Sequence, residues 1–441
     1  MGESTPKPGP RRDLYDLLTG DDEARVCKDI PDEACREQPK NFFIHGTALT
    51  LTKLGDGLGD AKLVLAWLLS SLGAPSYLIG LLVPVREALS LLPQLLVAAQ
   101  IRRHAIRKWF WVAGTVIEGL ALILMALATL LLEGAGAGWA VILCLALFSI
   151  ARGIASIAQK DVLGKTIAKT RRGTVSGYAG TIASLGIGAF GLYLVVFSPS
   201  GDAAFFALLL TAAGVLFCAA AATFARLEEQ TGATEGGGNA VDFTKRQLAQ
   251  LHEDPALRRF IIARSLFVAT ALMPPYLVAL LQQSGSAGLF DLGQLIVASG
   301  IAGGLSAAVW GRLADRSSRL VMMATGALAG LTAFGTGILA LTAPTSLSAP
   351  FLIPAAIFLV ALAHAGMRIG RKTYIVDLAG SDRRAGYVAL SNTLIGLVLL
   401  LSGLVGVFAE AAGMGAALLL LAALSLLGVW LAHGLPEVQE S

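Results

Sequence analysis

Long apolar runs alternate with short polar connections along almost the whole chain. A helix needs about 20 apolar residues to cross a hydrocarbon layer of roughly 30 Å, and runs of that length recur. They are too long and too evenly apolar for barrel strands, which alternate with period two over about ten residues. We therefore predict twelve membrane-spanning helices, at residues 42–73, 76–99, 108–132, 137–158, 173–197, 203–225, 258–282, 289–311, 319–342, 348–370, 386–409 and 412–433.

Composition and charge indicate the location and orientation of these helices. The chain has 441 residues, of which 55% are hydrophobic and 15% charged, which is too apolar for a soluble protein. Connections such as LGAPSY and TAPTSLSAP contain no Lys or Arg, whereas the intervening set carries Arg102, Arg103, Arg312 and others. The positive-inside rule then places the basic loops and both termini in the cytoplasm of a multi-pass inner-membrane protein. The net charge of +4 reflects this topology and contact with anionic membrane lipids, and it requires no nucleic-acid partner.

The chain also resembles itself at a fixed offset, which is the signature of an internal repeat. A shift of 212 residues places RRGTVSGYAGT at 171–181 over RRAGYVALSNT at 383–393, and AQIRRHAIR over GRLADRSSR. We predict an all-α integral membrane protein of twelve transmembrane helices in two pseudo-symmetric six-helix bundles. Its parts are a cytoplasmic tail at 1–41, a bundle at 42–226, a linker with an amphipathic helix at 227–257, a second bundle at 258–433 and a tail at 434–441.

One loop carries a motif that connects this organisation with a known family. The loop contains Gly311, Leu313, Ala314, Asp315, Arg316 and Arg319. It resembles the G-x-L-a-D-r-x-G-R-k motif of the major facilitator superfamily, from which Ser318 and Leu320 depart. The resemblance implies solute transport. Physically, the Asp and Arg residues of this loop can form an ion-pair latch between helices at the inner face, and we expect Arg368 and Arg371 to be the partners of Asp315. The alternative role for these two arginines is substrate binding. In the first half, the same frame holds Arg103 in place of the acid.

Four charges interrupt the first predicted span, in the stretch LTKLGDGLGDAKLVLAWLL. In a continuous helix, a turn of about 100° per residue puts Lys53, Asp56 and Asp60 on one arc. Trp67 lies on the same arc, and Lys62 points the other way. A charge at the bilayer centre costs roughly 2.5–3.5 kcal/mol, so we expect this arc to face a cavity. The structural alternative is an anchor in which Lys53 extends to the inner interface and pairs with Asp56.

Further candidates lie in other predicted spans. His364 falls on Arg152 under the same shift of 212 residues. Pro274 and Pro275, directly before Tyr276, are expected to break the seventh span and expose backbone groups to a central cavity. The candidate substrate and proton-coupling residues are therefore Lys53, Asp56, Asp60, Trp67, Arg86, Glu87, Glu118, Arg152, Tyr276 and His364.

A cavity with one charged wall and one apolar wall suits a small amphipathic organic solute, either an efflux substrate or a lipid-like molecule. We expect secondary active transport by alternating access, with a proton on Asp56, Asp60, Glu87 or Glu118 as the coupling ion, since burial makes reversible protonation of a carboxylate feasible. No metal or resident cofactor is expected, and we expect the chain to act as a monomer.

Two other functions remain open from the sequence. A divalent-metal carrier would use His45, Asp56, Asp60 and Glu87, although nearby lysines and Arg86 would repel a cation. A receptor or scaffold of the same fold would transport nothing. An enzyme is not expected, because the chain has no nucleophile constellation, H-E-x-x-H, phosphate loop or dinucleotide fingerprint. The cysteines match neither zinc nor disulfide spacing and are expected to be free thiols, at Cys27, Cys35, Cys144 and Cys218.

Overall fold

The computed structural model describes residues 15, 30–92, 97, 100–232, 234, 251, 254–284 and 287–439, without the side chains of 307 and 380–385. The described residues form α-helices and one short 3₁₀ segment. The N-terminal half contains α2 (Asp32–Leu58), α3 (Val64–Ser71), α4 (Ser76–Leu91), α6 (Lys108–Leu131), α7 (Gly134–Thr166), α8 (Lys169–Phe197) and α9 (Ala203–Ala225). The C-terminal half contains α11 (Pro255–Phe267), α12 (Ala269–Gln283), α13 (Leu289–Arg316), α14 (Ser318–Thr342), η1 (Pro344–Ser348), α15 (Leu352–Ser402), α16 (Leu404–Ala412) and α17 (Met414–His433).

Ten segments of the described chain are long and apolar enough to cross a membrane. They follow the last ten predicted spans in order. α11 and α12 together form one of them, and α15 with α16 supplies two, Leu352–Ala379 and Gly386–Ala412. The first two predicted spans are occupied by α2, α3 and α4, of which α3 has only 8 residues and α4 has 16. The predicted amphipathic helix of the linker lies almost entirely outside the described residues.

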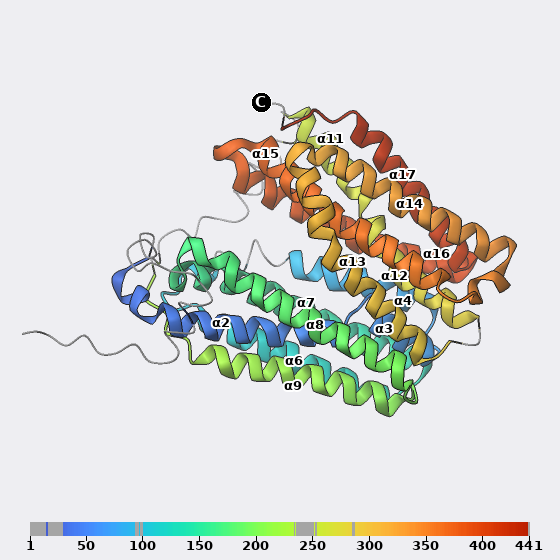
Figure 1. Ribbon diagram of the computed structural model, residues 1–441, viewed down its shortest axis with the longest axis horizontal. Helices are drawn as coiled ribbons and strands as arrows, with labels where there is room; N and C mark the ends of the chain where they lie inside the picture. Colours follow the sequence, from blue (N-terminus) through green and yellow to red (C-terminus); the bar gives the residue numbers. More distant parts are fainter. Residues whose placement is uncertain are drawn as a thin grey trace, which may run out of the picture.

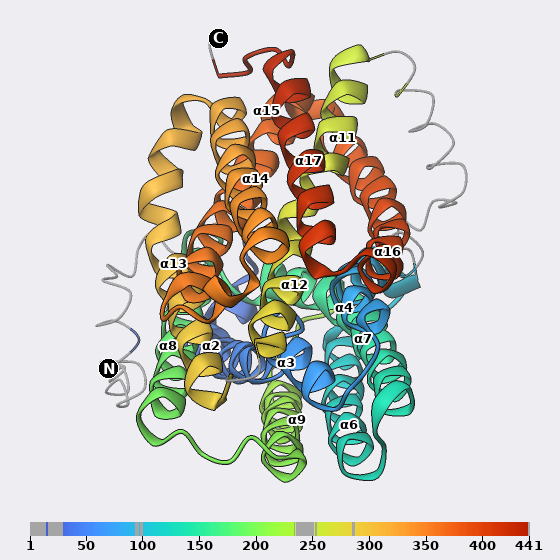
Figure 2. The ribbon, with the colours of Figure 1, turned by 90° about the vertical axis from the view of Figure 1, so that its right-hand side faces the viewer.

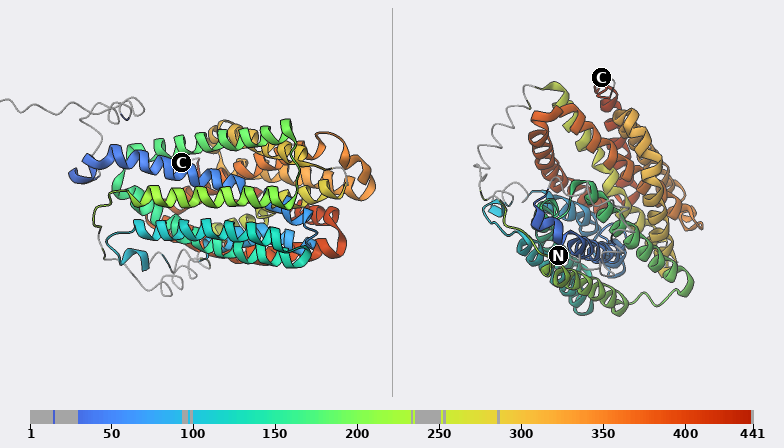
Figure 3. Two further views of the ribbon diagram at one scale, coloured as in Figure 1. Left: turned by 90° about the horizontal axis from the view of Figure 1, so that it is seen from below. Right: turned by 60° about the vertical axis from the view of Figure 1, so that its left-hand side comes forward.

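Each half packs mainly within itself. In the N-terminal half, α6 packs against α7 and α9, and α2 against α8 and α9, whereas in the C-terminal half α14 packs against α15 and α17. Figure 1 shows the helices of the N-terminal half, blue to green, mostly below those of the C-terminal half, yellow to red, with α13 running down against α8. The helices of the N-terminal half run side by side along the long axis of the molecule (Figure 3).

The two halves contact each other mostly at one end. We call the end that carries Arg103 and Arg316 the basic end, and the opposite one the far end. At the far end, the Gln282 side chain donates to the Trp67 carbonyl over 3.1 Å. A Cβ atom on Gly80 would lie 2.4 Å from the Cα of Gly406, so only glycine permits this crossing of α4 and α16. Figure 1 shows the halves meeting at the far end and separating towards the basic end, and Figure 2 shows α3 and α12 between them.

The first predicted span is not one continuous helix. α2 ends at Leu58 and α3 starts at Val64, so the prediction of a helix through 42–73 is wrong. Glycine and aspartate are weak helix formers, and here the Asp60 carboxylate accepts hydrogen bonds from the backbone N–H groups of Lys62 (3.0 Å) and Leu63 (2.8 Å). These bonds satisfy donors at the start of α3 and stabilise the interruption.

The seventh predicted span is also interrupted, but not at its prolines. Pro274 and Pro275 both lie inside α12, and the break falls at Val268, which separates α11 from α12. A proline interferes with the carbonyl four residues earlier, so its effect reaches back towards the start of α12. The expected break at Pro274 and Pro275 is therefore displaced by about one and a half turns.

The cysteines agree with the prediction only in part. Cys144 and Cys218 are free thiols, as expected. Cys35 is instead disulfide-bonded, which corrects the expectation of a free thiol there. Cys27 lies outside the described residues.

Candidate functional site

Four of the predicted residues form ion pairs with each other inside the N-terminal half. We call them the paired cluster: Asp56 on α2, Arg86 on α4, Glu118 on α6 and Arg152 on α7. Arg86 lies 3.2 Å from the Asp56 carboxylate, Arg152 also pairs with Asp56, and Arg152 Nε lies 2.9 Å from Glu118. The Glu118 side chain is 1% exposed. Two acids and two arginines thus compensate each other, which is the condition for burying charge in a bundle.

The aromatic ring of Phe148 lies beside both arginines of this cluster. The guanidinium carbon of Arg86 is 4.8 Å from the ring centroid, and that of Arg152 is 5.5 Å away. Such cation–π contacts stabilise a cation that has lost water. All the groups that hold the paired cluster therefore belong to one half of the molecule.

A second group of ionisable residues lies between the halves, and we call it the cavity cluster. It comprises Lys62 and Glu87 from the N-terminal half and Arg264, His364, Arg368 and Arg371 from the C-terminal half. These residues line a cavity of about 90 Å³ together with apolar groups of α4, α11, α12 and α15. Glu87 interacts electrostatically with Lys62 and Arg86 of its own half, and with Arg371 across the boundary between the halves.

A hydrogen-bonded chain crosses this boundary. Lys62 Nζ lies 3.2 Å from His364 Nε2, and His364 Nδ1 lies 3.1 Å from the Thr270 hydroxyl. The Thr270 hydroxyl donates in turn to the Phe267 carbonyl over 2.9 Å. With the Lys62 ammonium as donor to Nε2, Nδ1 of the neutral imidazole carries the proton and donates to Thr270. Lys62 therefore points into the site, contrary to the orientation predicted from a continuous helix.

Arg264 is the most deeply buried arginine of the cavity cluster, at 8% exposure. Its two terminal nitrogens donate to the Ser391 hydroxyl over 2.5 Å and to the Asn392 side-chain oxygen over 2.9 Å. Both partners lie on α15, within the segment that the internal repeat had singled out. The guanidinium is thus held in one orientation against the cavity.

A larger cavity of about 330 Å³ adjoins the first and shares Lys62, His364 and Arg368 with it. Asp60 contributes the carboxylate, and the remaining wall is mostly small or apolar. It is lined by Gly57, Asp60, Lys62, Leu63, Val64, Ser184, Ile187, Pro274, Ile296, Ser299, Gly300, Gly303, Ile357, Ala361, His364, Ala365 and Arg368. We call these two adjoining cavities together the central chamber; it has a charged part and an apolar part and is lined by residues of both halves.

Three predicted cavity residues lie elsewhere. Lys53 is exposed and donates to the Ser176 carbonyl over 3.3 Å rather than pairing with Asp56, so the proposed Lys53 anchor takes a different partner. Trp67 is buried and lines a separate cavity of about 630 Å³ at the far end. Tyr276 is buried beside Gly80, where α4 crosses α16. The expected common arc of Lys53 and Trp67 was a consequence of the assumed continuous helix.

The predicted latch has different partners from those expected. Asp315 and Arg316 are exposed and Gly311 is half-buried at the end of α13. Arg319 donates to the Leu435 carbonyl over 3.0 Å and pairs with Glu437 at 3.5 Å. Arg368 and Arg371 line the central cavities instead, so their expected pairing with Asp315 is wrong for the part of the chain described here. The face of α15 that carries them turns towards the N-terminal half.

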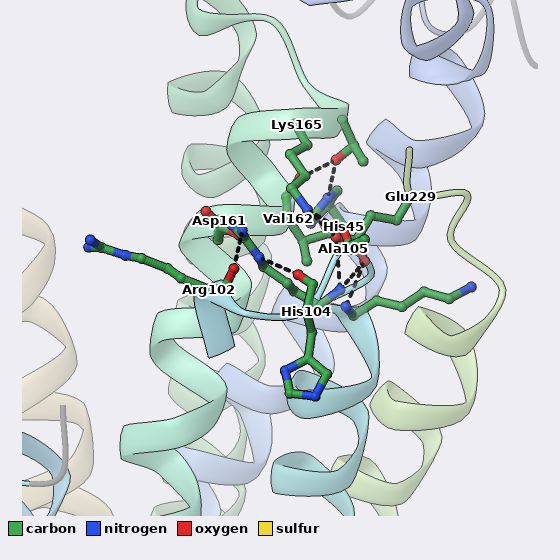
Figure 4. A network of polar contacts seen from close by, with 11 residues as sticks. His45, Arg102, His104, Ala105, Asp161, Val162, Lys165 and Glu229 are labelled. Carbon is green, nitrogen blue, oxygen red and sulfur yellow. Dashed lines mark hydrogen bonds and ion pairs between the residues drawn. The ribbon is translucent and has the colours of Figure 1, made fainter. Parts of the chain in front are cut away.

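The first half has its own ion-pair network at the basic end, shown in Figure 4. The Glu229 carboxylate accepts hydrogen bonds from the backbone N–H groups of Arg107 (2.8 Å) and Lys108 (2.6 Å), and it caps the start of α6. Lys165 donates to the same carboxylate over 2.8 Å, and Arg107 pairs with Asp161. The first half has Arg103 where the motif has an acid, and Asp161 and Glu229, which lie outside the motif, supply the carboxylates of this network instead. The sequence analysis did not identify these two residues.

His45 belongs to the region of this network and not to the central cavity. Its Nε2 lies 2.9 Å from the Thr166 hydroxyl, and the ring is fully buried against Phe224. The set of His45, Asp56, Asp60 and Glu87 that a metal carrier would need is therefore not assembled. Groups of three or more candidate metal ligands are absent among the described residues.

Residues just after α9 also contact α2 in the first half of that helix. The Asn41 amide donates to the Glu228 carbonyl over 2.9 Å, and Lys40 pairs with the Glu228 carboxylate. The Lys40 ammonium lowers the pKa of the Glu228 carboxyl below its ordinary value. This contact and the Glu229 cap hold the beginning of the predicted linker against the N-terminal half.

Comparison with known proteins assigns the family. The family model described as Major Facilitator Superfamily matches residues 54–353. A search of curated proteins finds no match.

Among solved structures, a mutant form of the nucleoside transporter NupG superimposes with a TM-score of 0.69 at 14% identity, covering 89% of this chain and 99% of its own. A D-xylose-proton symporter gives 0.67 at 12% identity, with 91% and 99% covered. A POT family transporter in complex with a thioalcohol-conjugated peptide gives 0.68 at 12% identity, with 91% and 97% covered. At these identities the structures establish the fold, and the family match over more than half of the sequence shows that this chain belongs to the Major Facilitator Superfamily.

Proposed function

We propose that this protein is a secondary active transporter that moves a small amphipathic organic solute by alternating access, coupled to proton movement. The observation that carries the proposal is the central chamber, whose charged and apolar parts are lined by residues of both halves. A site shared in this way changes its exposure when one half rocks against the other. The apolar walls suit the body of an efflux substrate or a lipid-like molecule, and the ionisable groups suit its head.

The proposed topology has twelve spans in a six plus six arrangement. α2 with α3 provides the first span and α4 the second, in addition to the ten apolar segments. The basic end then faces the cytoplasm by the positive-inside rule, with both termini on that side of the inner membrane. In this orientation, the halves are closed at the outer face and separated towards the cytoplasm. We further propose that the chain functions as a monomer in contact with membrane lipids.

For proton coupling, Asp60 and Glu87 are better suited than Asp56 and Glu118. The latter two are held by arginines of their own half. Glu87 interacts electrostatically with Lys62 and Arg86 of its own half, and in addition with Arg371 and Arg368 of the opposite half. Protonation of Glu87 would remove an attraction between the halves and so bias which side is open. The D-xylose-proton symporter among the structural neighbours adds support for proton coupling by analogy of fold.

The test uses purified full-length protein in proteoliposomes with a pH-sensitive dye inside. Uridine, D-xylose, dialanine and hexanoate are added outside in turn, with and without a pH gradient. We expect at least one solute to cause a proton flux in the wild type. Asp60→Asn and Glu87→Gln should abolish proton-driven uptake, while Glu133→Gln, an exposed acid at the far end, should behave as the wild type.

Two outcomes would contradict the proposal. Undiminished proton flux in both Asp60→Asn and Glu87→Gln would exclude these carboxylates as coupling groups. Solute binding without flux in any gradient would contradict transport and favour a receptor or scaffold of the same fold. Correct folding of each variant is checked by its melting temperature before reconstitution.

A further inference from the structure

The cavity cluster carries more positive than negative charge. Among the residues that line the two central cavities, the cations are Lys62, Arg264, Arg368 and Arg371, and the carboxylates are Asp60 and Glu87. His364 is neutral when it accepts a hydrogen bond from Lys62. Uncompensated charges inside a membrane protein are costly and mark substrate or ion pathways. The surplus therefore points to an anion as the missing partner.

The two carboxylates are already engaged. Asp60 accepts two backbone hydrogen bonds at the start of α3. Glu87 is shared between Lys62, Arg86 and the arginines of α15. These two carboxylates cannot compensate all four cations. Among the described side chains, the arginines of the C-terminal half therefore keep positive charge that an anion could neutralise.

The arginines also have a suitable arrangement for an anionic group. Arg368 and Arg371 are three residues apart on α15, so they lie on the same face of the helix, where like charges repel each other. Arg264 faces the same cavity from α11, and its Nε is buried and has no hydrogen-bond partner among the described residues. Planar guanidinium groups bind carboxylate and phosphate oxygens in pairs.

The larger cavity provides the place for an apolar body. At about 330 Å³ it falls in the size range of small-molecule sites. Ile187, Ile296 and Ile357 contribute to its wall, and Lys62, His364 and Arg368 mark the point where it meets the cationic part. A molecule with an acidic head and an apolar body would fill both cavities at once.

We propose that the solute is an organic anion whose carboxylate or phosphate head group binds among Arg264, Arg368, Arg371 and Lys62, with its apolar body in the larger cavity. The inference rests on the proposed transport function and specifies its substrate class. It excludes organic cations and divalent metals, which the same four side chains repel.

The experiment measures the melting temperature of detergent-purified full-length protein with a charge-matched panel. Hexyl, cyclohexylmethyl and 3-phenylpropyl bodies are each tested as carboxylate, phosphate monoester, alcohol and ammonium. A ligand that binds only the native state raises its melting temperature. We expect stabilisation by carboxylates or phosphates and none by alcohols or amines, and comparison of the two anionic arms identifies the head group. Stabilisation by amines or alcohols, an equal response to every charge, or no response to any anion would overturn the proposal.

Variants then locate the binding. Arg371→Gln and Arg264→Gln should each weaken the apparent affinity for the best anion about tenfold or more, as expected for loss of a charge-assisted hydrogen bond. Arg371→Lys, which keeps the positive charge, should retain part of the affinity for the anion. Arg258→Gln, which removes an exposed charge of α11, should bind as the wild type. If Arg264→Gln fails to fold, Arg371→Gln and Arg371→Lys carry the test, and unchanged affinity in Arg371→Gln would contradict the site.

Flux measurements separate this inference from the transport function itself. An anion that binds in an Arg371-dependent manner but is never transported would leave the anion site standing and contradict transport. Transport of a cation or a neutral solute would support the transport function and contradict the anion site. Arg371-dependent binding and flux of the same anion would support both.

Discussion

The paired cluster and the cavity cluster use the same kinds of residue in opposite ways. In the paired cluster, each charge meets an opposite charge of the same half, as Asp56 does with Arg86 and Arg152. In the cavity cluster, cations of both halves surround one space with too few carboxylates. Compensated charges inside one half link the helices of that half to each other. Under the proposed function, uncompensated charges between the halves are available to bind a ligand and to respond to movement of the halves.

The basic end also has charges that are compensated within one half and charges that are not compensated between the halves. Arg107 and Lys165 are compensated by Asp161 and Glu229 within the N-terminal half. Between the halves, Lys160 of α7 and Lys372 of α15 interact as like charges. These two lysines are also equivalent under the internal shift of 212 residues. The position of a charge relative to the boundary between the halves therefore predicts its role better than its residue type.

The largest effect on stability should come from breaking the paired cluster. Arg152→Met leaves Glu118 buried without its guanidinium partner, and removal of one member of a buried pair costs about 3–5 kcal/mol. We expect a loss of this size in the free energy of unfolding, measured by SDS titration of the detergent-solubilised protein. The double variant Arg152→Met with Glu118→Leu removes both charges and should recover much of the loss. A single variant as stable as the wild type would show that this cluster is not structural.

The second largest effect should come from the basic-end network. Glu229→Ala removes the cap of α6 and the partner of Lys165. Losing a helix cap costs about 1 kcal/mol and losing a charged hydrogen bond about 1.5–3 kcal/mol, so we expect a loss of about 2.5–4 kcal/mol in the same titration. Glu133→Ala, which alters an exposed acid, is the control. Equal stability of the two variants would contradict the role of Glu229 as a cap.

Sequence patterns could predict the helical segments and their order, because a membrane span needs a length of apolar residues that is visible locally. They could also predict that Asp60, Glu87 and His364 point inward, because charge on a lipid-facing surface is costly. The break between α2 and α3 was missed although Gly57, Gly59 and Asp60 signalled it, since these glycines also fit tight helix packing.

Partner choice could not be predicted, because it depends on how helices far apart in sequence pack. Arg371 faces Glu87 rather than Asp315, and the acid that caps α6 comes from Glu229, after α9. Arg264 could not be placed in the site from its sequence position, because only the folded α15 brings Ser391 and Asn392 to it. The direction of Lys62 was wrong for a local reason, namely the interrupted helix.

A smaller effect is expected on the balance between conformations. Lys160→Glu replaces a repulsion between the halves by an attraction to Lys372, and exposed ion pairs contribute about 0.2–1 kcal/mol. The population closed at the basic end should therefore rise by up to about fivefold. Spin labels at Arg103 and Arg316, in a variant without the native cysteines, report the distance between the halves. Lys160→Glu with Lys372→Glu should restore the repulsion, and an unchanged distance distribution in the single variant would contradict this role.

The smallest effect on stability should come from substituting Arg371, although we expect this residue to contribute most to anion binding. Arg371 lies beside Arg368 and faces Lys62 across the cavity, and neutralising one of several like charges relieves repulsion while giving up the attraction to Glu87. These contributions oppose each other, so Arg371→Gln should change the free energy of unfolding by no more than about 0.5 kcal/mol, as at an ordinary surface site. The same variant should lose anion-dependent stabilisation. SDS titration with and without the best-binding anion measures both quantities on one sample. A loss of several kcal/mol without anion would place Arg371 with the structural charges and remove the distinction between the two clusters.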